Sequence, residues 1–125
     1  MTIAEVSKYY ELSIDTLRYY ERAGLIPPVR RGKGGMRDYS DKDIEWVGFI
    51  KCMRIANIPI EVLVKYVNLF KEGKSTQEDR KSLLKEQRDQ LAEQIAKLQK
   101  ILKKLDYKIA NYGTVVLSAE KKLVW

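Results

Sequence analysis

Apolar residues recur every three or four positions along most of the chain, which predicts a protein built mainly of α-helices. Ile3, Val6 and Tyr10 follow this spacing and predict a first helix over about residues 2–10. A second helix is expected to begin after Ser13, whose side chain is a favourable N-cap. The short break between these two helices is typical of a helix-turn-helix, which we place at about residues 3–23.

Glycine and proline divide the next part of the chain. The stretch "VRRGKGGMRDY" predicts two very short strands around a glycine turn, at about residues 29–39. "SDKD" then supplies Ser40 as an N-cap with acids in the first turn of a third helix, which runs to about Ala56. A fourth helix is expected between Pro59 and Gly73.

From about Ser75 the apolar spacing becomes a heptad repeat. Leucines or tyrosine stand seven residues apart, and isoleucine or leucine recurs four residues after several of them: Leu84, Leu91, Leu98, Leu105 and Tyr112, with Ile95, Leu102 and Ile109. This pattern predicts a helix over residues 75–112 whose apolar stripe is too narrow to be buried within one chain. The stripe therefore favours a coiled coil with a second copy. Residues 113–125 form a short tail that could at most cap it.

Composition and charge narrow the possible functions. The 125 residues carry a formal net charge of +7, which favours a polyanionic partner without choosing between DNA, RNA and an acidic membrane surface. We expect a protein that does not span a membrane and is not secreted, because the sequence has no long apolar run and no secretory pattern at Met1. A single cysteine cannot form an internal disulfide, which is typical of a cytoplasmic protein. The absence of histidine argues against an enzyme, a metal site or a bound cofactor.

The positive charge is concentrated between Arg18 and Arg37, where six cations and one acid give a net charge of +5. Its cations lie on the predicted second helix and on the glycine-hinged ribbon, which is the arrangement of a recognition helix followed by a basic wing. On spacing alone, an amphipathic helix with a solvated loop explains the pattern equally well. A phosphate-binding nucleotide loop fits less well, because "GKGG" lacks the Lys-Ser/Thr ending.

The words "TIAEVSKYYELSIDTLRYYERAGLI" and "RDYSDKDI" resemble the MerR family of transcription regulators. The resemblance covers residues 1 to about 72 and continues in general form through the long helix. It implies a mainly α fold, with a winged helix-turn-helix DNA-binding domain at residues 1–72 and a long helix that forms an antiparallel coiled coil in a homodimer.

The resemblance also implies a function. Such dimers bind a pseudo-palindromic operator in double-stranded promoter DNA and activate transcription by RNA polymerase when they distort the promoter spacer. Excisionase-like architectural proteins share the winged fold and remain an alternative, although the long heptad helix argues against them.

Eight residues are predicted to contact DNA. Thr16, Arg18 and Tyr19 match the family's recognition helix, while Arg37 and Tyr39 match its wing. Ser13, Arg22 and Arg31 join them through their positions on the same helix and ribbon. The segment Pro59–Ile60 matches the start of a second wing.

The lone cysteine, Cys52, has two interpretations. From the residues alone, burial as a small apolar side chain beside Phe49 and Ile55 is favoured. Lys51 and Arg54 would instead favour a reactive thiolate, and the pattern is similar to MerR regulators that sense aldehydes and other electrophiles through one cysteine. The chain departs from the metal sensors of the family, because no cysteine or histidine follows Cys52.

Overall fold

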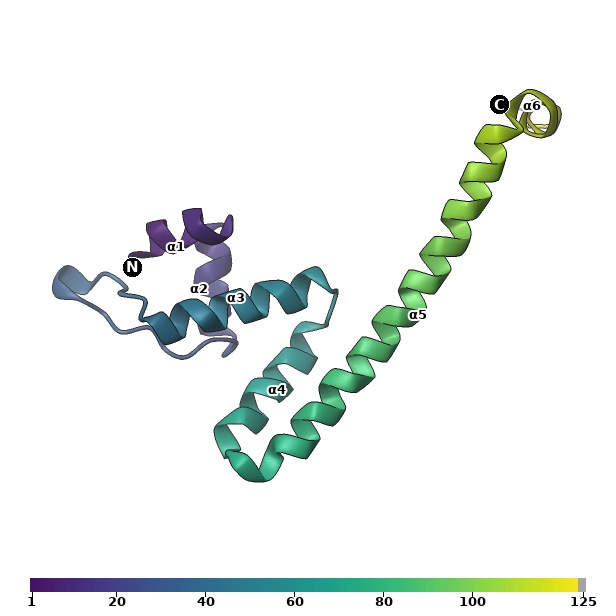
Figure 1. Cartoon of the computed structure of the whole chain (residues 1–125). Helices are drawn as coiled ribbons and strands as arrows, with labels where there is room; N and C mark the ends of the chain where they lie inside the picture. The colour runs from purple at the N-terminus through teal and green to yellow at the C-terminus, as the bar shows by residue number, and fades with distance from the viewer. Residues whose placement is uncertain (124–125) are drawn as a thin grey trace. The chain divides into compact units, whose positions relative to one another are not determined.

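The computed structural model of the chain describes residues 1–123, so the last two residues of the predicted tail, Val124 and Trp125, lie outside the described part. The elements are α1 (Ile3–Tyr10), α2 (Ile14–Arg22), a 3-10 turn (Lys33–Gly35), α3 (Asp41–Ile55), α4 (Ile60–Glu72), a second 3-10 turn (Lys74–Thr76), α5 (Gln77–Ala110), a π-helical turn (Tyr112–Val116) and α6 (Leu117–Glu120) (Figure 1). The chain divides into two compact units, residues 1–87 and residues 88 onward, and α5 contributes to both.

The first two helices begin and end where local hydrogen bonds allow. Thr2 caps α1 through a capping box, because its hydroxyl accepts from Glu5 N at 3.1 Å while its own N–H donates to Glu5 Oε1 at 2.9 Å. Glu11 adopts a left-handed conformation (φ 55°) and ends the helix. Ser13 then caps α2. The short break predicted between the two helices is confirmed.

Helices α3 and α4 follow the same logic. Ser40 and Asp43 form a second capping box at the start of α3, with Asp43 N donating to Ser40 Oγ at 3.2 Å and Ser40 N to Asp43 Oδ2 at 3.0 Å. Asn57, with φ 62°, lets the chain turn after α3, and Pro59 precedes the first residue of α4. The cap and boundaries predicted for this helical pair are confirmed to within a residue or two.

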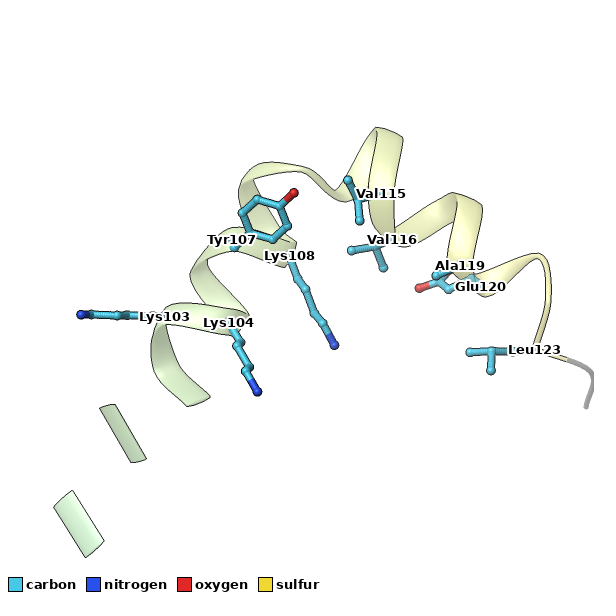
Figure 2. A pocket seen from close by; sticks show the side chains of 9 residues that line it. All are labelled: Lys103, Lys104, Tyr107, Lys108, Val115, Val116, Ala119, Glu120 and Leu123. Atoms are coloured by element: carbon cyan, nitrogen blue, oxygen red, sulfur yellow. The ribbon is translucent and has the colours of Figure 1, made fainter. Parts of the chain in front are cut away.

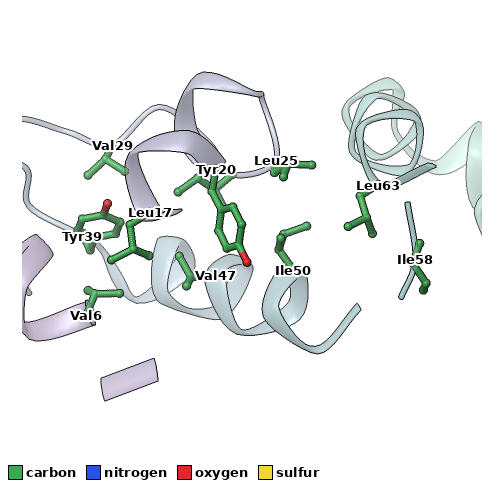
Figure 3. Close-up of a cluster of buried hydrophobic side chains, with 11 residues drawn as sticks. Val6, Leu17, Tyr20, Leu25, Val29, Tyr39, Val47, Ile50, Ile58 and Leu63 are labelled. Carbon is green, nitrogen blue, oxygen red and sulfur yellow. The ribbon is translucent and has the colours of Figure 1, made fainter. Parts of the chain in front are cut away.

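The core of the first unit joins all four short helices (Figure 3). Side chains from α1, α2, the wing segments and α3 meet there with a side chain from α4, and the fully or nearly fully buried members include Val6, Leu17, Tyr20, Leu25, Val29, Tyr39, Val47, Ile50 and Leu63. Burial of this apolar surface is the main force that holds the short helices together, since helices of eight or nine residues are not stable alone.

The wing, residues 29–39, is less regular than the sequence predicted. Among the described residues it contains one antiparallel bridge, Arg31 with Arg37, in place of two short strands. Its tip is the 3-10 turn, where Gly34 and Gly35 have φ of 80° and 77°. Two backbone hydrogen bonds flank this bridge, from Gly32 N to Met36 O and from Asp38 N to Arg30 O, both at 2.7 Å. Beyond them, both ends of the wing turn inward to bury Val29 and Tyr39.

The second unit holds the end of α5 and a helical hook made by residues 112–120. The Tyr112 hydroxyl donates to Glu120 Oε1 at 3.1 Å, and the hook borders a groove of about 560 Å³ (Figure 2). Apolar side chains along α5 remain open to solvent in the single chain, with Leu98 64% exposed. None of the described helices combines the length and hydropathy that a bilayer-spanning segment requires.

We expect Gly48→Ala to destabilise the first unit. A Cβ at this position of α3 would lie 2.6 Å from the Tyr10 hydroxyl oxygen and 3.1 Å from its ring. That hydroxyl donates to Ile44 O at 2.8 Å, so Tyr10 cannot move without losing a hydrogen bond. Overpacking of this kind costs about 1–3 kcal/mol in the free energy of unfolding, which chemical denaturation at constant protein concentration would measure.

Gly32→Ala is the matched control, because the nearest atom to its added Cβ is Met36 O at 3.7 Å. This variant should change the free energy of unfolding by less than about 0.5 kcal/mol. Adding Tyr10→Phe to Gly48→Ala removes the closest atom and should recover part of the loss. An unchanged stability for Gly48→Ala alone would contradict the packing described between α1 and α3.

Candidate nucleic-acid interface

The outer face of α2 presents cations and an aromatic ring to solvent. The Arg18 side chain is about half exposed, and its only described ion pair joins Nη1 to Asp15 Oδ1 at 3.7 Å, where Asp15 is almost fully exposed. The Arg22 guanidinium lies 5.6 Å from the centre of the Tyr19 ring, which orders both side chains on the same face. A loose surface ion pair is worth little, so Arg18 can leave Asp15 for a phosphate or a base edge.

Two hydroxyls mark the start of α2. Ser13 Oγ accepts from Thr16 N at 3.0 Å and lies 2.8 Å from Thr16 Oγ1. Both predicted DNA contacts therefore sit at the N-terminus of the helix, where free N–H groups and the helix dipole favour an anion. Ser13 also has a capping role that the structure shows directly.

The tip of the wing is braced from within. Arg31 Nη1 donates to Gly35 O at 2.8 Å across the turn, and the side chain remains exposed. Arg30 and Lys33 are exposed as well. The wing therefore presents three cations around a turn that consists largely of glycine, which has no side chain. This arrangement could follow a phosphate backbone.

Glu21 links the wing to α2, and sequence reasoning did not single it out. Its Oε1 accepts from Arg37 Nε at 2.8 Å, and its Oε2 accepts from Val29 N at 3.3 Å. The side chains of Glu21 and Arg37 are only 19% and 18% exposed. Arg37, predicted to contact DNA, thus braces the wing in the free chain, with its charge balanced by Glu21.

A hollow of about 380 Å³ lies between α2 and the wing. It is lined by Arg18, Glu21, Arg22, Pro28 and Arg37, so three guanidinium groups face one carboxylate. The excess positive charge makes this hollow a suitable place for a phosphate group.

Tyr39 is a core residue in the free chain, and its contact with DNA stays a prediction. Its side chain is 2% exposed and lies among Leu17 and Val29 (Figure 3). The hydroxyl is buried without a hydrogen-bond partner among the described residues, and burial raises the pKa of Tyr39 above its usual range. The sequence pattern does identify Tyr39 as the end of the wing. In the free chain its side chain serves packing of the core.

Cys52 is exposed in the single chain, so the prediction that it is buried among its neighbours on α3 is wrong. Ile55, one turn further along, is also 73% exposed. The flanking cations are held elsewhere: the Lys51 ammonium donates to the Tyr10 carbonyl, and Arg54 Nη1 donates to Ile58 O at 2.9 Å.

Across residues 1–123, no three His, Cys, Asp or Glu side chains are grouped to hold a metal ion.

Comparison with protein families gives this surface its context. A profile described as "MerR HTH family regulatory protein" matches residues 1–70, and one described as "MerR, DNA binding" matches residues 44–107. The chain belongs to the MerR family. The members it resembles are DNA-binding transcriptional regulators.

Two relatives of the MerR chain illustrate the range of similarity. It is 54% identical over 93 residues to the HTH-type transcriptional regulator AdhR of Bacillus subtilis (strain 168), an alignment that covers 74% of this chain and 66% of the relative. The chain thus spans slightly under two thirds of that protein. An uncharacterized HTH-type regulator of Haemophilus influenzae is 32% identical over 111 residues, covering 89% of this chain and 82% of the relative.

Solved structures agree with the MerR fold. A MerR-family regulator from Listeria monocytogenes superposes with a TM-score of 0.85 at 43% identity, covering 98% of this chain and 92% of the other. HiNmlR, a MerR-family regulator that lacks the sensor domain and was solved bound to promoter DNA, superposes with a TM-score of 0.80 at 31% identity. That alignment covers 93% of this chain and 92% of HiNmlR.

We expect Tyr39→Phe to leave operator binding within about twofold of the unmodified protein, because the removed hydroxyl does not reach the surface. Removing a buried, unpaired hydroxyl should leave stability unchanged or raise it by up to about 1 kcal/mol. A mobility-shift titration and chemical denaturation test the two parts. A tenfold loss of affinity with normal stability would show that Tyr39 is exposed to a phosphate when DNA binds.

Proposed function

We propose that this MerR-family chain binds promoter DNA as a homodimer, with α2 in the major groove and the wing on the neighbouring phosphates. The observation that carries the proposal is the exposed face of Arg18, Tyr19 and Arg22, which lies directly beside the basic hollow at the wing. Arg18 is suited to a base edge, while the hydroxyls of Ser13 and Thr16 at the helix start are suited to phosphates. HiNmlR, which was solved bound to promoter DNA, supports promoter DNA as the partner.

The charge along α5 supports an antiparallel homodimer. Residues 77–93 carry five acids and four bases, a net charge of −1, whereas residues 94–110 carry five bases and one acid, a net charge of +4. A parallel pair would place two +4 halves side by side, while an antiparallel pair places each beside a −1 half. The exposed apolar side chains of α5, such as Leu98 and Leu102, would form the buried seam.

Such a dimer would act on the shape of its operator. Two recognition helices related by a twofold axis select a pseudo-palindromic site. Each helix is held by phosphates at its own half-site, so a conformational change in the dimer would change the twist of the spacer DNA between the half-sites. We propose that this distortion activates transcription by RNA polymerase in the cytoplasm. An excisionase-like architectural role remains the alternative, and a footprint confined to a promoter spacer would exclude it.

The assignment of Arg18 can be tested by Arg18→Ala. We expect a loss of about 1–3 kcal/mol in operator binding if the guanidinium reads a base, with weaker discrimination against altered operators. Lys71→Ala removes an equal charge from the end of α4 and is the control for net charge. Mobility-shift titrations at several salt concentrations measure both effects, and equal affinities for the two variants would refute the role of Arg18.

We propose further that Cys52 senses reactive aldehydes or related electrophiles. The resemblance to single-cysteine MerR regulators suggests this role, and the exposure of the thiol gives an electrophile access to it. The adduct would add volume to the face of α3 that Cys52 shares with Ile55, and a second surface packed on that face in the dimer would be displaced. The displacement would reach the DNA as a change in twist.

Electrophile treatment should therefore change in vitro transcription from the operator-bearing promoter while operator affinity changes by less than about threefold, since both clamped states keep their phosphate contacts. Cys52→Ser keeps the size of the side chain and removes the nucleophile, so it should abolish the response. Mass spectrometry of the same samples locates the adduct. If the serine variant responds equally, the effector acts at another site and Cys52 has no sensing role.

A further inference from the structure

Four aromatic side chains gather on the surface of the first unit, between α3 and α4. Trp46 and Phe49 come from α3, and Tyr66 and Phe70 come from α4. The Trp46 ring meets Phe49 at 5.8 Å and 87°, and Phe70 at 5.0 Å and 79°, while Phe49 and Tyr66 lie 5.4 Å apart. These four rings and Glu45 line a shallow groove, open to solvent, of about 190 Å³, which we call the aromatic box.

The aromatic box lies at the edge of the core, because Trp46 and Phe49 pack against the buried cluster. Val47 and Ile50 on α3 are fully buried, whereas Trp46 and Phe49 are half-buried and Phe70 is 47% exposed. The core residues already hold α3 against α2 and α4. The rings pack on one another edge-to-face or tilted, and the part of this cluster that stays open to water points to a binding role.

The electrostatics of the box favour a positive ligand. Ring faces carry negative partial charge, and the Glu45 carboxylate stands at the rim. Within residues 1–123, Glu45 takes part in none of the five ion pairs. The chain itself already places a cation here, because the Arg80 guanidinium lies 5.2 Å from the centre of the Phe70 ring.

Arg80 cannot fill the groove, because its side chain is tied down outside it. Its Nε donates to Thr76 Oγ1 at 3.1 Å, and its Nη2 donates to Gly73 O at 3.4 Å. Arg80 is also absent from the residues that line the box. One cation is thus fixed over the Phe70 ring, while none of the cations in the described part of the chain lies over the other three rings or pairs with Glu45.

We propose that the aromatic box binds a small organic cation of the quaternary ammonium class, with the cation against the rings and Glu45 balancing its charge. A volume of about 190 Å³ suits a compact alkylammonium head group and is smaller than a site for a whole drug-sized molecule. A metal ion is not suited to the box, because one carboxylate among four rings supplies too few oxygen ligands. The site joins α3 to α4 and needs neither the DNA-binding face of α2 nor Cys52.

Intrinsic tryptophan fluorescence can report binding directly. In the Trp125→Phe variant of this chain, Trp46 is the single tryptophan, so its emission isolates the aromatic box. The probe is choline, and the control ligand is its uncharged carbon analogue, 3,3-dimethyl-1-butanol, at the same ionic strength. We expect a saturable change with choline that is about 3- to 30-fold tighter than any change with the neutral analogue.

Two matched variants separate a cation site from general effects of charge. Glu45→Gln should weaken choline binding about 3- to 10-fold, whereas Glu61→Gln removes an acid of α4 outside the box and should leave it unchanged. Phe70→Leu keeps an apolar side chain but removes a ring wall, and it should weaken binding as well. Circular dichroism confirms that each variant is folded.

Several outcomes would overturn the proposal. An equal response to choline and to the neutral analogue would show an apolar groove without preference for charge. An equal loss in Glu45→Gln and Glu61→Gln would show attraction to the whole surface. No response to choline, including the case in which a partner chain already covers Trp46, would exclude the site in the protein as it exists.

Discussion

The nine residues of α2 form one face that packs into the core and another face that is exposed to solvent. The arrangement of the DNA-binding unit depends on both faces. Leu17 and Tyr20 are buried against α3, while Arg18, Tyr19 and Arg22 are left on the opposite side. A helix this short gains little stability from its own hydrogen bonds. Packing of the inner face against the core therefore keeps the helix folded and fixes the positions of the side chains on the outer face. The cations can therefore be presented on a rigid surface without being needed for folding.

Glu21 lies between these two faces and extends the rigidity of α2 to the wing. One carboxylate accepts from the backbone of Val29 at one end of the wing and from Arg37 at the other. A partly buried ion pair of this kind adds little to net stability, because desolvation offsets much of the Coulomb attraction, but it fixes geometry. The separation between the recognition helix and the basic tip of the wing is thereby set by one acidic side chain, and a phosphate that attracted Arg37 would have to compete with Glu21.

The sequence predicted the helices well because their caps and apolar spacing are local features. Ser13, Ser40 and the heptad leucines each carry their information within a few residues, and the structure places helices where they indicate. The conformation of the wing was harder to predict from local sequence. The two expected strands are one bridge in the structure, and Val29 and Tyr39 at the ends of the wing are buried in a core formed by distant residues. The same long-range packing hides Tyr39, and the pairing of Glu21 with Arg37 across 16 residues has no local pattern. The aromatic box could not be predicted either, because its rings come from two helices whose relative placement depends on Asn57 and Pro59.

The single chain leaves several apolar surfaces exposed, and the proposed homodimer would cover them with a second copy. Leu98, Leu102 and Ile109 on α5 are 64%, 58% and 74% exposed, and Ile55 on α3 is 73% exposed beside Cys52. An antiparallel pair would bury the α5 stripe and carry each DNA-binding unit to the opposite end of its partner's helix. Any surface that such a dimer packs on Ile55 would also contact Cys52. The reactivity of the thiol would then depend on how tightly that contact closes, so the same apolar face would govern both access of an electrophile to Cys52 and the orientation of α2 on DNA.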